Sequence, residues 1–244
     1  MTIRAGMGGW TYEPWRNTFY PKGLAHSREL AFASRQVTSI EVNGTFYSTM
    51  SPATYAKWHA ETPDNFMFSL KGPRYAVNRK VLADAGDSIQ RFIASGIDRL
   101  DAKLGPILWQ LAATKPFNPE DIAHFINLLP ARIGDRPLRH VLEPRHPSFA
   151  DPRLTDLCTA ANVAVAYADS ETYPCFPAQT ADFTYARLQN GQDHEPTGYP
   201  DAALDGWAEQ AREWGLNGRD AFVYFIAGGK VRAPAAAMSL ISRL

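Results

Sequence analysis

Eight short segments rich in apolar and β-branched residues recur along the chain, and this recurrence restricts its fold more than any other feature. Consecutive segments begin about 20 to 40 residues apart, as strand–helix–strand units require. Strands that alternate with helical stretches predict a parallel sheet covered by helices. The predicted strands are Ile3–Gly6, Ser39–Asn43, Phe66–Lys71, Ile107–Leu111, His140–Glu143, Val163–Asp169, Phe183–Leu188 and Ala221–Ile226.

Eight such units in 244 residues predict an α/β fold of the closed, TIM-like (β/α)8 barrel type. A doubly wound open sheet is the main alternative, but no G-x-G-x-x-G motif follows the first predicted strand. The sequence contains no internal repeat, low-complexity tract or linker. We therefore expect residues 1–244 to form a single domain.

One connection of this barrel is expected to be irregular. Residues 170–182, between the sixth and seventh predicted strands, contain Pro174 and Pro177. Proline in a helix interior removes a hydrogen bond and clashes with the preceding turn, so little room remains for a helix. We expect a loop that packs Tyr173 and Phe176 over the barrel.

The charge balance and the cysteine content narrow the expected partners and compartment. Lys and Arg number 25, as do Asp and Glu, so the formal net charge is zero, which disfavours a broad basic surface for nucleic acid or anionic membranes. Cys158 and Cys175 form no C-x-x-C motif, which indicates a reducing compartment. No apolar run approaches the ~18 residues of a membrane span, and the first residues lack a signal peptide. We expect a cytoplasmic protein with no membrane partner.

Polar residues gather at the carboxyl ends of the predicted strands, where barrels of this type build their sites. Residues two apart in a strand share a face. This alternation groups Glu41 with Asn43, Ser69 with Lys71, and Glu143 with Arg145, while Gln110, Asp169 and Arg187 end the fourth, sixth and seventh strands. The charged members are expected to form one ring: Glu41, Lys71, Glu143, Arg145, Asp169 and Arg187.

The three acids and three bases of this ring would cancel one another's charge, which makes their burial tolerable. A structural salt-bridge network that plugs the barrel is the alternative interpretation. A functional site is favoured because charges at the same end of five strands are hard to explain by solvation alone.

Three further features have two interpretations each. The pairs Gly8–Gly9 and Gly228–Gly229 can present backbone N–H groups to an anion, or can be ordinary turn glycines. His146 can act as acid, base or ligand, or can cap a neighbouring loop. An aromatic group after the first strand can form a wall for a ligand or a lid on the barrel rim; its members are Trp10, Trp15 and Tyr20.

A series of motifs runs along essentially the whole chain. They are Gly8-Gly9-Trp10 with Trp15 and Phe19-Tyr20-Pro21, Glu41-Val42-Asn43-Gly44-Thr45-Phe46-Tyr47, Trp58 with Thr62-Pro63, Phe68-Ser69-Leu70-Lys71, Leu104-Gly105-Pro106-Ile107-Leu108-Trp109-Gln110, Glu143-Pro144-Arg145-His146, Asp169, Tyr185-Ala186-Arg187-Leu188 and Ala233-Pro234. Together they resemble the domain-of-unknown-function family number 72, also called YecE-like. The resemblance implies a TIM-like barrel, polar residues clustered at the strand ends and no established activity.

The chain departs from the pattern of that family at several positions. Asn78 and Gln189 stand where the family often has histidine, and Ile226-Ala227 stands where it commonly has two asparagines. These differences indicate a variant subgroup and leave open whether it shares the chemistry of the family.

Several barrel chemistries can be weighed against the ring. A metal-dependent amidohydrolase would need H-x-H at the first strand, where the chain has Gly6-Met7-Gly8. A glycosidase would use Glu41 and Glu143, at unknown separation. A Schiff-base enzyme needs a desolvated lysine, and Lys71 is the candidate, but we expect Glu41 and Glu143 to hold it protonated.

For the cofactor, we expect none. The alternative is a divalent metal held in an oxygen-rich site, as in sugar isomerases and barrel nucleases, by Glu41, Glu143, Asp169 and His146.

The leading hypothesis is an enzyme, a hydrolase or an isomerase, that acts on a small anionic or phosphorylated polar molecule. Arg145, Arg187 and Lys71 would hold the anion, because guanidinium offers paired donors to carboxylate or phosphate. Other substrate-binding residues of the pocket would be Asn43, Gln110 and Asp169.

In this hypothesis Glu41 or Glu143 acts as general base and His146 donates a proton. A nucleic-acid-processing or nucleic-acid-binding protein is the second hypothesis, with its phosphate contacts confined to the same mouth. The third is a ligand-binding barrel without catalysis.

Overall fold

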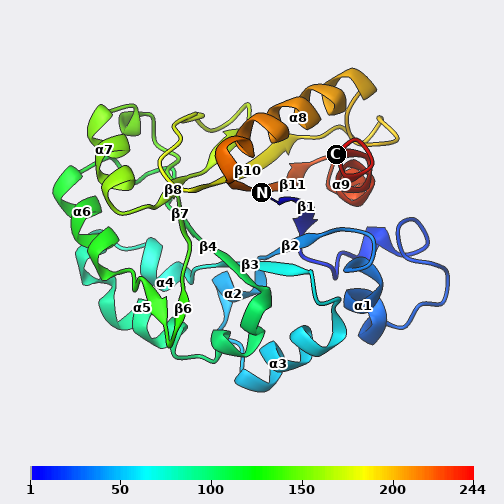
Figure 1. Cartoon of the computed structure of the whole chain (residues 1–244), viewed down its shortest axis with the longest axis horizontal. Helices are drawn as coiled ribbons and strands as arrows, with labels where there is room; N and C mark the ends of the chain where they lie inside the picture. The colour runs from blue at the N-terminus through cyan, green and yellow to red at the C-terminus, as the bar shows by residue number, and fades with distance from the viewer. Residues whose placement is uncertain (1) are drawn as a thin grey trace.

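A parallel sheet of nine strands forms the centre of the molecule (Figure 1). The computed structural model describes residues 2–244, apart from the side chain of Ala227. The strand order is β8-β7-β4-β3-β2-β1-β11-β10-β9. The strands are β1 Ile3–Gly8, β2 Ser39–Val42, β3 Met67–Lys71, β4 Leu104–Gln110, β7 His140–Glu143, β8 Ala164–Val165, β9 Tyr167–Asp169, β10 Phe183–Asn190 and β11 Asp220–Gly228.

The two outer strands of this order are halves of one predicted strand, separated only by Ala166. The first half, β8, pairs with β7, and the second half, β9, pairs with β10. Between them, the amide of Ala166 donates to the carbonyl of Leu142 at 2.9 Å. The sheet therefore closes on itself, and the predicted TIM-like barrel is confirmed.

Helices surround the sheet, and side chains cap three of the α-helices, one of them through Asp151, which accepts from the amide of Arg153. The Asn118 side chain accepts from the amides of Glu120 and Asp121, and the Ser51 side chain from the amide of Thr54. No helix in residues 2–244 is both long and apolar enough to cross a membrane. The α-helices are α1 Glu29–Ala33, α2 Gly44–Tyr47, α3 Pro52–Glu61, α4 Arg74–Val77, α5 Gly86–Ile93, α6 Pro119–Leu128, α7 Pro152–Ala160, α8 Asp201–Trp214 and α9 Ala233–Ile241.

Shorter elements complete the connections. A small antiparallel hairpin joins β5 Arg132–Ile133 to β6 Arg136–Pro137. The 3-10 turns are η1 Glu13–Trp15, η2 His26–Arg28, η3 Leu82–Ala85, η4 Ile97–Lys103, η5 Pro147–Phe149, η6 Leu216–Gly218 and η7 Lys230–Arg232.

The connection from residue 170 to residue 182 contains no helix, as its two prolines predict. Its two aromatic residues separate. Tyr173 lies at the barrel mouth against Arg145. Phe176 lies on the outer side instead, beside Phe149 and Leu154. The expectation that both rings pack over the barrel is therefore met by Tyr173 only.

Residues alternate along each strand between the helix layer and the barrel interior. The interior holds an apolar cluster of Leu108, Val141, Ala164, Ala166, Phe183, Tyr185, Phe222 and Tyr224. Within this interior, the Tyr224 hydroxyl lies 2.6 Å from both the Ser39 and the Ser69 hydroxyls. Most of the predicted ring residues lie further along, at the carboxyl ends of the strands: Lys71 ends β3, Glu143 ends β7, and Arg187 lies in the second half of β10.

Candidate active site at the barrel mouth

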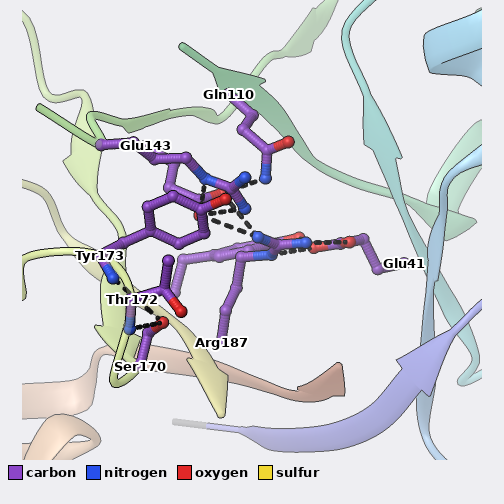
Figure 2. Close-up of polar contacts among 9 residues, drawn as sticks. Glu41, Gln110, Glu143, Ser170, Thr172, Tyr173 and Arg187 are labelled. Atoms are coloured by element: carbon purple, nitrogen blue, oxygen red, sulfur yellow. Dashed lines mark hydrogen bonds and ion pairs between the residues drawn. The ribbon is translucent and has the colours of Figure 1, made fainter. Parts of the chain in front are cut away.

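The guanidinium of Arg187 lies between two carboxylates at the barrel mouth (Figure 2). It comes from β10, and it donates to Glu41 from Nε at 3.0 Å and from one terminal nitrogen at 3.1 Å. The other terminal nitrogen donates to the two oxygens of Glu143 at 2.9 and 2.7 Å. All three side chains are buried. Strand alternation brings them together from β2, β7 and β10.

Three more side chains bind these carboxylates. Tyr185, also on β10, donates its hydroxyl to Glu41 at 2.7 Å. Gln110 at the end of β4 donates to Glu143 at 2.8 Å, and Arg145 donates to the same carboxylate at 3.1 Å. Such charge-assisted bonds make the burial of charge tolerable. We call this group the mouth network: Glu41, Gln110, Glu143, Arg145, Tyr185 and Arg187.

The loop that was predicted between residues 170 and 182 packs against one face of the Arg145 guanidinium. The Ser170 hydroxyl accepts from the amides of Thr172 and Tyr173 at 3.2 and 3.3 Å, which fixes a turn (Figure 2). This turn places the Tyr173 ring centroid 4.0 Å from the Arg145 guanidinium carbon. The aromatic face attracts the cation and limits its movement.

The contacts of the mouth network favour the ionised forms of Glu143 and Arg187. Burial by itself raises the pKa of the Glu143 carboxyl, but the charges of Arg187 and Arg145 outweigh burial, and the pKa is lowered. Burial by itself lowers the pKa of Arg187, but Glu143 and Glu41 outweigh burial, and the pKa is raised. A carboxylate with a lowered pKa is a weak base, which counts against Glu143 in the predicted role of general base.

Lys71, at the end of β3, is in a different environment. Its side chain is 7% exposed, and its Nζ lies 4.4 Å from the ring centroid of Phe46. Burial, and next the charge of Arg187, lower the pKa of Lys71 to about 8. Glu41 and Glu143 raise the pKa of Lys71, in the direction that was expected, but burial and the charge of Arg187 outweigh them. With a pKa of about 8, the amine is still mostly protonated at neutral pH.

A cavity of about 290 Å³ opens above the mouth network. Five of the predicted site residues line it: three lie on strands β3, β4 and β10, one follows β2 and one follows β7. These residues are Asn43, Lys71, Gln110, Arg145 and Arg187.

Two further polar residues of this cavity are absent from the sequence-based candidates. Lys230 lies in η7 after β11, with its Nζ 4.3 Å from the ring centroid of Tyr12. Gln189 lies near the end of β10, and its buried Nε2 has no hydrogen-bond partner within residues 2–244. Gln189 lies two residues after Arg187 on β10, so strand alternation predicts that the two share a face. Lys230 lies beyond the last strand, in η7, where strand alternation makes no prediction.

A second cavity, of about 510 Å³, adjoins the first, because Gly8, Asn43 and Lys230 belong to both linings. Four aromatic residues contribute to its wall. The aromatic residues in this wall are Trp10, Tyr12, Tyr47 and Trp58.

The three aromatic residues singled out after the first strand divide between the two interpretations. Trp10 lines the second cavity. Trp15 and Tyr20 are buried and hold the rim together, and Trp15 also lines the first cavity. The Trp15 indole donates to the carbonyl of Lys230 at 2.9 Å, and the Tyr20 hydroxyl donates to the carbonyl of Trp10 at 2.6 Å.

Asp169 does not join the charged ring. It shares its face of β9 with Tyr167, whose ring packs against Trp214 of α8. Its carboxylate accepts from Asn190 at 2.9 Å instead. The expected ring of three acids and three bases is therefore corrected to two acids and three bases, because the alternation of the sixth strand turns Asp169 toward the helix layer.

His146 also lies outside the cavity lining, and it caps the turn that follows it. Its Nδ1 accepts from the amide of Ser148 at 3.2 Å and lies 2.7 Å from the hydroxyl of the same residue. The capping interpretation therefore describes its position, and the structure does not bring it to Glu41 or Glu143.

The two glycine pairs serve backbone packing. A Cβ at Gly228 would lie 2.5 Å from the carbonyl oxygen of Gln189, and Gly229 has a positive φ of 59°. The amide of Gly9 is already bound to the carbonyl of Glu41 at 2.8 Å. Of these glycines, only Gly8 lines the first cavity, so the turn-glycine interpretation fits the Gly228–Gly229 pair.

The side chains at the mouth are not arranged as the metal-site and glycosidase hypotheses require. Within the described residues, no three His, Cys, Asp or Glu side chains form a group that could hold a metal ion. Asp169 and His146 lie outside the ring, and the Arg187 guanidinium occupies the space between Glu41 and Glu143. A glycosidic oxygen would need that same space.

The positions at which the chain departs from the family pattern lie in different places. Gln189 and Ile226 line the first cavity. Asn78 lines a separate groove of about 830 Å³ between the loops after β3 and β4. Ala227 belongs to β11 by its backbone, and its side chain lies outside the described part of the structure.

The comparisons with known proteins agree with this fold. A DUF72 family protein from Thermotoga maritima is 20% identical with a TM-score of 0.77, and the match covers 99% of this chain and 97% of that one. A DUF72 family protein from Enterococcus faecalis is 17% identical with a TM-score of 0.76, covering 100% and 95% of the two chains. A structure of a D-psicose 3-epimerase is 13% identical with a TM-score of 0.54, covering 98% and 90%. These identities show a shared fold only. The comparison with curated proteins found no match.

The sequence comparison covers almost the entire barrel. The family described as "Protein of unknown function DUF72" matches residues 4–244, from β1 to the end of the chain. This range includes all residues of the mouth network and both adjoining cavities. The chain belongs to the DUF72 family.

Proposed function

We propose that this protein is an enzyme that acts on a small anionic or phosphorylated polar molecule bound at the barrel mouth. The observation that carries the proposal is the excess of positive charge around the first cavity. Glu41 and Glu143 supply two negative charges, whereas Arg187, Arg145 and Lys71 supply three positive ones. Lys230 adds a fourth cation to the lining of the cavity.

The cations have distinct roles in this proposal. Arg187 uses its nitrogens on Glu41 and Glu143, so it supports the site rather than gripping a ligand. Arg145 is 17% exposed at its side chain, and it keeps donors in addition to those that bind Glu143. Lys71 contributes a nearby charge. An anion between them would form charge-assisted hydrogen bonds in a partly desolvated cavity.

Inorganic phosphate or a sugar phosphate should raise the unfolding temperature. A ligand that binds only the folded state adds about 2.7 kcal/mol at a hundredfold excess over its Kd. For a chain of this size, that corresponds to roughly 5–10 °C. Arg145→Ala should abolish the shift, and Arg91→Ala on the exposed face of α5 should keep it. Differential scanning fluorimetry with increasing phosphate measures both.

Other outcomes would redirect the proposal. A comparable shift from Mg²⁺ or Mn²⁺ would favour a cation site instead. Tighter binding of single-stranded oligonucleotides than of mononucleotides, with a steep salt dependence, would favour a nucleic-acid function. If no anion shifts the unfolding temperature of a folded protein, the mouth network is structural.

A further inference from the structure

We propose that Lys71 forms an imine with a small aldehyde or ketone that also carries a carboxylate or phosphate group. This inference rests on the proposed anion site and deepens it by naming the substrate class. It follows from the position of one amine within the first cavity, beside the groups that would hold the anion.

The surroundings of Lys71 favour an amine that is available to react. Its Nζ faces the ring of Phe46, and within residues 2–244 it takes part in no ion pair, whereas Glu41 and Glu143 pair with Arg187. The Thr45 hydroxyl donates to the backbone carbonyl of Lys71 at 2.7 Å, which fixes the end of β3. By contrast, the buried Nζ of Lys103 donates to two carbonyl oxygens, those of His59 and Thr62.

Burial and the charges of Arg187 and Arg145 lower the pKa of this amine, and together they outweigh Glu41 and Glu143, which raise it. Burial lowers the pKa of Lys71 most, and the charge of Arg187 lowers it next, to about 8. A neutral amine is the nucleophile in imine formation, so a lowered pKa increases the reactive fraction at neutral pH. The charged groups that face this amine are Glu41 on β2, Glu143 on β7, Arg145 after β7, Arg187 on β10 and, across the cavity, Lys230 in η7.

The reaction is balanced without an oxidant or a reductant. The Nζ lone pair forms a bond to the carbonyl carbon, and the carbonyl π electrons move to oxygen. The nitrogen releases two protons in two steps, the oxygen takes up two, and water leaves as the C=N bond forms. Protonation of the imine from solvent restores a positive charge beside the bound anion, near Arg145.

Trapping with borohydride tests this inference. The intact protein is incubated with glyoxylate and sodium borohydride, which delivers hydride to the imine carbon and leaves a stable secondary amine. Peptide mapping by mass spectrometry should place the adduct on Lys71 ahead of the exposed Lys57 and the buried Lys103. Lys71→Arg should lose this adduct, and Arg145→Ala should reduce it roughly tenfold, because a charged hydrogen bond to the anion is lost.

Further measurements separate this inference from the proposed function. Phosphate should compete with glyoxylate for labelling, and uncharged acetaldehyde should label Lys71 less. The labelling rate should rise from about pH 7 to about pH 9 as the amine loses its proton. Stabilisation by phosphate with no adduct on Lys71 overturns the inference and leaves the proposed function standing. If acetaldehyde labels Lys71 as readily and phosphate neither competes nor stabilises, both are overturned.

Discussion

Replacing Arg187 by Met is expected to lower the free energy of unfolding by about 3–5 kcal/mol, because it leaves two buried carboxylates without their shared partner. Methionine keeps much of the volume of the side chain but none of its donors. Glu41 would retain only the bond from Tyr185, and Glu143 only those from Gln110 and Arg145. Urea unfolding followed by far-ultraviolet circular dichroism at neutral pH measures the loss.

An exposed arginine provides the matched control. Arg153 pairs with Asp151 at 2.7 Å, and its side chain is 62% exposed. Arg153→Met removes an ion pair of similar length, but water solvates the carboxylate that remains, so the unfolding midpoint should hardly change. Equal effects of the two substitutions would contradict the account of the mouth network as a buried and desolvated group.

The pH dependence of the Arg187→Met effect has a definite sign. In the unchanged protein the pKa of Glu143 is lowered, so its stabilising contribution is present above the unfolded-state pKa and is lost as the pH falls through the folded-state pKa. In the variant, burial without the guanidinium raises the pKa of the carboxylates, so stability is lost as the pH rises. The difference between the two proteins should therefore shrink as the pH is lowered toward about 4.

Strand alternation explains why much of this site could be predicted from the sequence. Once the segments were assigned as parallel strands of one barrel, residues two apart had to share a face. Glu41, Lys71, Glu143 and Arg187 lie at strand ends on the inner face, and the structure places all four at the mouth. Parallel strands align their carboxyl ends, so these four residues come together although they are far apart in the sequence.

The misplacement of Asp169 shows where that reasoning was incomplete. In the segment from residue 163 to residue 169, the even positions are all alanine, whereas the odd positions are Val163, Val165, Tyr167 and Asp169. Alanines fill the crowded interior and the larger residues face the helices. This alternation is visible in the sequence, and it decides the direction of the Asp169 side chain more strongly than the position of Asp169 at the end of the strand does.

Other features depend on geometry that no local pattern encodes. The pairing of both carboxylates with Arg187 rather than Lys71 is decided by reach: a planar guanidinium spans two carboxylates, and an ammonium is a single point of charge. The position of Lys230 depends on η7, a turn beyond the last strand. Loops carry no strict periodicity, so alternation could not place it.

Replacing Gly6 by Ala is expected to lower the free energy of unfolding by at least about 3 kcal/mol, at the upper end of overpacking effects. A Cβ at this position of β1 would lie 1.7 Å from the carbonyl oxygen of Ser39. The obstacle is the backbone of β2, which cannot rotate away as a side chain could. The two strands would have to separate where Gly6 pairs with Ser39. Chemical unfolding measures this effect.

Gly206→Ala is the control with the opposite expected sign. Gly206 is exposed within α8, and a Cβ there meets no atom within 4 Å, so alanine should stabilise the protein by about 0.5–1 kcal/mol. The displacement caused by Gly6→Ala should also weaken phosphate binding, because Glu41 follows Ser39 by two residues on β2 and anchors Arg187. Gly206→Ala should leave phosphate binding unchanged. A Gly6→Ala protein that unfolds at the original denaturant concentration would show that β1 and β2 can part without loss, and that the mouth network does not depend on their close approach.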